Sequence, residues 1–294
     1  MSAPTLSGRT GSTEVASFAR QHPGVVTVAK VGWVAKGVVY ALLGVLAVPI
    51  ALHGSGADDG GSGSTQASQT GAVARLAESS AGALALWLVA IGLFFYVAWR
   101  LVCVLLPAGN GAKAWITRIG YVISAIVYVS VAWTAVSFAR DNSTKPAQGG
   151  AEDSKIEKFT RDLMEHSAGR WAVGIIGVAV IAVGVAFVVR GVTSDFRKEL
   201  EPGGVGPISE QAITRLGQIG WIGRGLMMMI VGWFLTMAAV HFRADKAKGI
   251  DGALREATGS ALGTALVFFV AVALIVYGVF CVISAPRVRL RGAD

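Results

Sequence analysis

The stretch VGWVAKGVVY at residues 31–40 has the composition of the start of a membrane-spanning helix, but it carries a lysine, Lys36, inside the apolar run. IGWIGRGLMM at 219–228 places an arginine at the same point, and IGYVISAIVY at 119–128 places a serine there. Aligned on their glycines, the stretches share the pattern [VI]-G-[WY]-[VI]-x-[KSR]-[GA] at offsets of 88 and 100 residues. This recurrence indicates an internal repeat, so we expect the chain to contain three related units.

The composition of the chain is that of a membrane protein. Hydrophobic residues make up 53% and charged residues 15% of the sequence, and the mean hydropathy is +0.60. A helix needs about 20 apolar residues to cross a hydrocarbon core, and backbone groups in lipid must be satisfied within the helix. The sequence therefore predicts an all-α membrane protein with six transmembrane helices, at about 31–53, 83–106, 117–138, 171–193, 216–240 and 262–284.

Each predicted unit contains two of these spans. An even number of spans returns the chain to its starting side, so all three units enter the membrane with the same polarity. This arrangement predicts three parallel two-helix repeats around a pseudo-threefold axis along the membrane normal. The expected divisions are an N-terminal cytoplasmic tail at 1–24, which lacks the apolar core of a signal peptide, and repeats at 25–107, 113–200 and 212–291.

The repeat motifs resemble a three-repeat, six-helix membrane family catalogued as domain of unknown function 1206, over about residues 25–291. The resemblance is carried by VGWVAKGVVYALLG, IGYVISAIVY and IGWIGRGLMMMIVG at the heads of the units, and by VYGVFCVISAPRVRLR at the end. The second unit departs from the pattern, because Ser124 and Ala125 replace the basic residue and its glycine. The resemblance implies a fold and a membrane location, and it implies no functional residue.

The head of each unit holds a glycine followed by an aromatic residue. A glycine on a transmembrane helix allows close approach of a second helix, and aromatic residues near the end of a span are typical of the membrane interface. We expect packing and interfacial roles for the six residues of this motif, which are Gly32, Gly120, Gly220, Trp33, Tyr121 and Trp221.

The basic residues of the motif have two interpretations. Lys36 and Arg224 lie about a turn and a half inside the predicted inner boundary, so a long side chain could snorkel to the headgroups. The sharper alternative is that Lys36, Ser124 and Arg224 face a polar cavity that gathers an anionic substrate or a lipid headgroup. The spacing favours snorkelling as the simpler interpretation.

A second set of polar residues recurs at the outer ends of the odd-numbered spans. His53 and His241 each follow the motif tryptophan by 20 residues, and Asp141 holds the corresponding place in the second unit. Two imidazoles and a carboxylate could bind a divalent metal if the three helix ends converge. The competing interpretation is that helix ends in water are commonly polar, and it is the favoured one.

Charge placement gives an expected orientation. The short segments on the side of the N-terminus are rich in Lys and Arg, which predicts that both termini are cytoplasmic and that the protein lies in the plasma membrane. The net charge of +8 then points to anionic lipid headgroups at the inner face as a partner, and not to nucleic acid.

Sequence motifs do not indicate an enzyme. The chain has no Gly-x-Ser-x-Gly elbow, His-Glu-x-x-His or Cys-x-x-Cys motif, and we expect no cofactor. The favoured interpretation is a non-enzymatic scaffold or accessory subunit with an unidentified membrane protein partner. The alternative is a small transporter or channel, with a path along the pseudo-threefold axis and a basic inner vestibule for anionic cargo.

Overall fold

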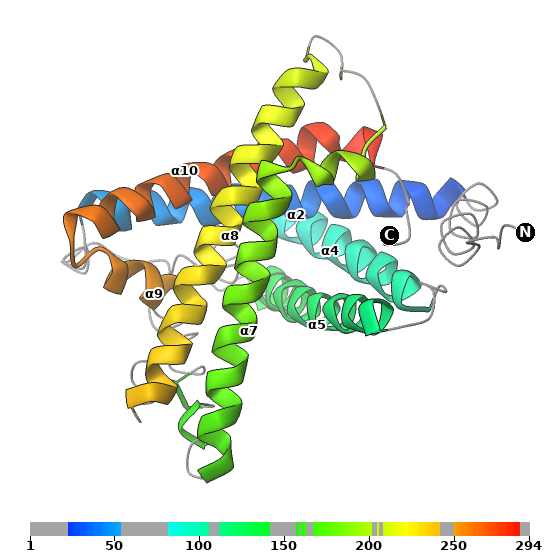
Figure 1. The fold of residues 1–294 in the computed structure, drawn as a ribbon. Helices are drawn as coiled ribbons and strands as arrows, with labels where there is room; N and C mark the ends of the chain where they lie inside the picture. The colour runs from blue at the N-terminus through cyan, green and yellow to red at the C-terminus, as the bar shows by residue number, and fades with distance from the viewer. Residues whose placement is uncertain are drawn as a thin grey trace, which may run out of the picture.

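The computed structural model describes residues 23–53, 82–105, 112–141, 157–158, 160–162, 167–201, 205, 208–241 and 250–288. These parts of the chain are almost entirely helical (Figure 1). They contain no strand beyond two isolated bridges, between Leu200 and Val288 and between Val205 and Ile208. The prediction of an all-α protein is confirmed.

Six helices are long and apolar enough to cross a membrane, which confirms the six predicted spans. They are α2 (Pro23–His53), α4 (Gly82–Leu105), α5 (Ala112–Asp141), α7 (Ser167–Val192), α8 (Glu210–His241) and α10 (Ala261–Ser284). The shorter helices are η2 (Asp195–Glu199), α9 (Ile250–Ala257) and η4 (Ala285–Arg287). The predicted tail lies outside the described residues up to residue 22.

The helices of the third unit begin at serine caps. The Ser209 hydroxyl accepts a hydrogen bond from the backbone N–H of Ala212 at 3.2 Å, just before α8. Ser260 does the same for Gly263 at 3.1 Å, at the start of α10. A serine at this position satisfies a backbone donor that has no partner within the helix, so it fixes where the helix starts.

Packing between helices follows the repeat. The second helix of each unit packs on the first helix of the next, which gives the pairs α4 with α5, α7 with α8, and α10 with α2. Within the first and third units, α2 also packs on α4, and α8 on α10. Among the described residues α5 and α7 share no comparable contact, so the ring of helices is open within the second unit.

The direction of one helix pair differs from the rest. In Figure 1, α7 and α8 lie side by side and run across α2, α4, α5 and α10. Close backbone contacts hold α7 to α8: a methyl group added at Gly177 would lie 3.1 Å from the carbonyl oxygen of Gly232, and one at Gly225 would lie 2.6 Å from that of Gly184. Because α7 packs on α8 in this way, it does not pack against α5 within the described ranges.

The three glycines at the unit heads differ in how closely another helix approaches them. A methyl group on Gly32 would lie 2.8 Å from the Cα of Tyr96, and one on Gly220 would lie 2.7 Å from the Cα of Tyr277. Each of these glycines therefore lets the second helix of its own unit touch the first. Gly120 has nothing within 4 Å of such a methyl group, so the expected packing role is not realised there. The cause is that α7 does not pack against α5 over their described residues.

This difference gives a matched pair of variants. We expect Gly32→Ala to lower the unfolding temperature in detergent, because the added methyl group overlaps the α4 backbone and overpacking costs roughly 1 to 3 kcal/mol. Gly120→Ala should be neutral or slightly stabilising, because alanine is the better helix former. Thermal unfolding of the purified full chain measures both. An equal loss of stability in the two variants would show that α5 packs against a second helix as α2 does.

Candidate functional site

The ammonium group of Lys36 lies inside the protein. The residue is 2% exposed, and its Nζ lies 5.3 Å from the centroid of the Trp33 ring, 5.5 Å from Tyr96 and 5.3 Å from Tyr277. The Tyr40 ring is slightly farther, at 6.0 Å. Aromatic faces within about 6 Å attract a cation through their quadrupole, so Lys36 sits in a cage of rings from three helices.

The guanidinium of Arg224 is placed in the same way from α8. Its Cζ lies 4.5 Å from the centroid of Phe187, 5.2 Å from Tyr40 and 5.5 Å from Tyr277. Its Nη1 also donates a hydrogen bond of 2.9 Å to the hydroxyl of Tyr277. Both basic residues of the repeat motif therefore contact the same two tyrosines, Tyr40 and Tyr277.

Every membrane-length helix contributes to this group of side chains, which we call the cation–tyrosine cluster. Its members are Lys36, Trp33 and Tyr40 from α2, Tyr96 from α4, Tyr128 from α5, Phe187 from α7, Trp221 and Arg224 from α8, and Tyr277 from α10. The cluster is therefore where the three units meet.

Helical spacing and the head glycines together position the cluster. Residues three and four apart share a helix face, which places Trp33, Lys36 and Tyr40 together on α2. On the opposing helices, Tyr96 and Tyr277 lie directly against the head glycines. A side chain at Gly32 or Gly220 would push these tyrosines away, so the glycines bring the phenol rings close to the cations.

The structure settles which way the predicted basic residues point. A snorkelling lysine has its stem exposed to lipid, whereas Lys36 is enclosed by protein and Arg224 is only partly exposed. The snorkelling interpretation is therefore wrong for Lys36. Ser124 is partly exposed on α5 and forms no hydrogen bond with the cluster among the described residues. The second unit contributes Tyr128 instead, whose hydroxyl lies 3.5 Å from that of Tyr40.

The aromatic residues of the motif also differ from the expected interfacial belt. Trp33 and Trp221 are 8% and 5% exposed, and the Trp221 ring packs edge-on against Tyr277 at 5.6 Å. Tyr121 is half-buried beneath the guanidinium of Arg100, at 5.0 Å. These rings face the protein because the head glycines bring a second helix against this side of α2 and α8.

Phe187 of the cluster was not identified from the sequence, and neither were Tyr96 and Tyr277. Both occupy the same place in a second repeated motif, YVAWR at 96–100 and YGVFC at 277–281, at an offset of 181 residues. An alignment of the even-numbered spans on these tyrosines would have found them. In the first unit the motif arginine, Arg100, donates from Nε to the Tyr96 hydroxyl at 2.9 Å.

The structure leaves the predicted metal site untested. His241 is exposed at the end of α8, and its Nδ1 lies 3.0 Å from the carbonyl oxygen of Met237 in the same helix. The side chains of His53 and Asp141 lie outside the described part of the chain. Among the residues that the structure does describe, no group of three or more His, Cys, Asp or Glu could hold a metal ion. The site at His53, Asp141 and His241 stays a prediction.

The positive charges of Lys36 and Arg224 have no negative charge beside them among the described residues. Within the described part of the chain, neither Lys36 nor Arg224 forms an ion pair with a carboxylate. Because both cations lie within 5.5 Å of the Tyr277 centroid, they are at most about 11 Å apart and repel by roughly 1.5 kcal/mol or more at an effective dielectric constant of ~20. Burying an ion costs several kcal/mol more, and aromatic contacts of roughly 0.5 to 2 kcal/mol each offset this cost.

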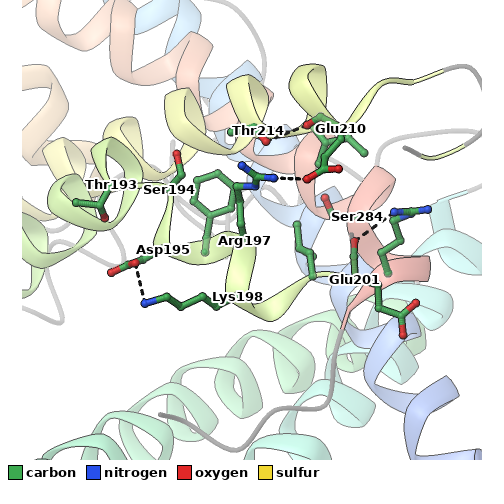
Figure 2. A pocket seen from close by; sticks show the side chains of 13 residues that line it. Thr193, Ser194, Asp195, Arg197, Lys198, Glu201, Glu210, Thr214 and Ser284 are labelled. Carbon is green, nitrogen blue, oxygen red and sulfur yellow. Dashed lines mark hydrogen bonds and ion pairs between the residues drawn. The ribbon is translucent and has the colours of Figure 1, made fainter. Parts of the chain in front are cut away.

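A pocket of about 390 Å³ lies beside the cluster, between the α7–α8 connection and the end of α10 (Figure 2). Its lining includes Arg197, which is paired with Glu210, and Lys198, which lies 3.0 Å from Asp195. Phe196 forms part of the same lining and packs on Phe280 with 5.3 Å between ring centroids.

Phe280 connects the two regions. Its ring lies 6.2 Å from Tyr277 and 6.5 Å from Trp33, both of which contact Lys36. A short stack of aromatic rings therefore separates the pocket from the cluster.

Comparison with known proteins places the chain in a family. Residues 31–105, 119–194 and 219–287 match the family described as Domain of Unknown Function (DUF1206). The chain belongs to the DUF1206 family. Its three matched segments confirm the internal repeat and the resemblance seen in the sequence.

A curated relative of this DUF1206 chain is "Uncharacterized protein YxxB" of Bacillus subtilis (strain 168). The two are 28% identical over 265 residues, which cover 89% of this chain and 90% of the relative. No solved structure matches the chain.

The hydroxyl of Tyr277 offers a direct test of the cluster. We expect Tyr277→Phe to lower the unfolding temperature in detergent, because it keeps the ring but removes the acceptor for Arg224, and a hydrogen bond to a charged group contributes roughly 1.5 to 3 kcal/mol. Tyr40→Phe is the matched control, since its hydroxyl has only the 3.5 Å contact with Tyr128. If the two variants lose the same stability, Arg224 does not depend on Tyr277.

Proposed function

We propose that this DUF1206 protein is a non-enzymatic transport protein that binds its solute at the cation–tyrosine cluster. The observation that carries the proposal is that Lys36 is buried, and that the partly exposed Arg224 contacts the same tyrosines with a buried Nε, where all the membrane-length helices contribute side chains. Ionisable residues inside a membrane protein are costly, face the protein interior and commonly mark a solute or ion path. No covalent chemistry is part of the proposal.

The cluster favours transport over the scaffold that the sequence alone suggested. A scaffold needs complementary surfaces, and apolar residues in place of Lys36 and Arg224 would give it a more stable core. Charges held in the core at a cost in stability are better explained by a solute that interacts with them. A scaffold remains the outcome to be expected if no solute crosses the membrane.

The pocket supports a route to the cluster from one side. From the pocket, a solute would pass the Phe196–Phe280 contact before reaching Lys36. The lining carries three basic and three acidic side chains, so the pocket by itself favours neither sign of charge. We propose that selection occurs at the cluster, with the aromatic contact as the barrier in the closed state.

Flux across liposomes tests this function. We expect the full-length protein to pass at least one small solute from a panel of anions, cations and neutral molecules, with saturation at high concentration. Lys36→Met and Arg224→Met should each lower this flux at least about tenfold, because the loss of a charged contact costs roughly 1.5 to 3 kcal/mol. Arg215→Met is the control, since Arg215 is exposed on the same helix as Arg224.

Two results would contradict transport. One is no flux of any solute by protein that is folded in the liposomes. The other is a flux that Lys36→Met, Arg224→Met and Arg215→Met all leave unchanged. Absence of flux together with copurification of one membrane protein in fixed ratio would instead support the scaffold or accessory subunit.

We further propose that the protein lies in the plasma membrane with both termini in the cytoplasm, with its basic inner rim against anionic lipid headgroups. The pocket then opens to the cytoplasm, because the α7–α8 connection and the end of α10 lie on that side.

The orientation predicts the behaviour of reporter fusions. A fluorescent protein fused after residue 294 should fluoresce, and alkaline phosphatase at the same point should be inactive. A fusion within the loop at 140–170 should give the opposite pair of results. Active phosphatase at the C-terminus would reverse the orientation and place the pocket outside.

A further inference from the structure

The groups of the cluster that lack partners are all hydrogen-bond donors. Arg224 Nε and the indole N–H of Trp221 are buried and have no hydrogen-bond partner. Among the described residues, the Lys36 ammonium also makes no hydrogen bond to a protein acceptor, and four aromatic rings lie 5.3 to 6.0 Å from it. A buried donor without an acceptor is costly, so these donors indicate a missing acceptor.

These three donors lie around one side chain. Lys36 Nζ is 5.3 Å and Arg224 Cζ is 5.5 Å from the centroid of Tyr277, and the Trp221 ring is 5.6 Å from it. Helices α2 and α8 therefore both place donors around the same tyrosine.

The missing acceptor should also carry a negative charge. Two cations that repel each other and have no carboxylate partner are both stabilised by one anion between them. Arginine recognises planar oxyanions through Nε and a terminal nitrogen acting together. In Arg224, Nη1 is occupied by Tyr277 whereas Nε is unpartnered, so this edge of the guanidinium remains available.

One hydroxyl group of the cluster fits the same ligand. The oxygens of Tyr96 and Tyr277 accept hydrogen bonds from Arg100 and Arg224, and the Tyr277 hydroxyl is also hydrogen-bonded to the thiol of Cys281. The Tyr96 phenol therefore still has its own O–H to donate toward a shared acceptor.

We propose that the cation–tyrosine cluster is a binding site for a small oxyanion, a carboxylate or a phosphate, held by Lys36, Arg224 Nε and Trp221 Nε1. This inference rests on the proposed function and names the chemical class of its solute. The phosphate could be free or could belong to a lipid headgroup.

Thermal unfolding of the full chain in neutral detergent tests the site without a need for flux. Acetate, inorganic phosphate, a short-chain phosphatidic acid and chloride are titrated at constant ionic strength. We expect acetate, phosphate or the phosphatidic acid to raise the unfolding temperature saturably, by about 5 °C at saturation, because a ligand that binds only the folded state stabilises it. A response to the phosphatidic acid alone assigns the oxyanion to a lipid.

Matched variants separate binding from general salt effects. Lys36→Met and Arg224→Met should abolish the rise, whereas Arg215→Met should keep it. Trp221→Phe keeps an aromatic ring, although a smaller one, and removes the N–H, and it should raise the dissociation constant about tenfold. Trp233→Phe is its control, because Trp233 is 55% exposed on the same helix.

The proposal is overturned if acetate, phosphate and phosphatidic acid leave the unfolding temperature unchanged, if chloride alone raises it, or if Lys36→Met responds like the unmodified chain. These outcomes are independent of transport. Saturable binding without flux would retain the oxyanion site and reject the transport function. Flux without oxyanion binding would retain transport and reject this ligand.

Discussion

The positive charges of Lys36 and Arg224 set the constraint that the surrounding structure has to meet. Each charge loses its hydration when the helices pack around it, and no carboxylate among the described residues replaces that water. Aromatic faces and phenol oxygens contact the cations instead, and they stabilise a cation without neutralising it. The cluster therefore keeps a positive potential inside an apolar assembly, and this potential is what an anion would recognise.

The head glycines make this arrangement possible. Tyrosines on α4 and α10 can reach the cations only because Gly32 and Gly220 allow the helix backbones to touch. The same pairs bury Trp33 and Trp221, which removes lipid from the faces that carry Lys36 and Arg224. Helix packing and the electrostatics of the site thus depend on the same two positions.

The sequence predicted the helices well and the site in part. Long apolar runs identify spans without any knowledge of packing, so all six membrane-length helices could be found. Helical periodicity also places Lys36 and Tyr40, which are four residues apart, on the same face. It could not show whether that face meets lipid or protein, and snorkelling was inferred for a residue that is buried. The contacts of Tyr96 and Tyr277 depend on pairing between helices, which only an alignment of the even-numbered spans would have indicated.

The second unit shows why the repeat is not uniform at the cluster. Where the other units carry Lys36 and Arg224, it carries Ser124, and it contributes the neutral hydroxyl of Tyr128 one turn later. A third cation in this position would add a repulsive interaction with each of the two already present, each roughly 1.5 kcal/mol at a similar separation. The neutral residue in the second unit therefore limits the contribution of the repeat motif to two charges, which a single anion between them would stabilise together.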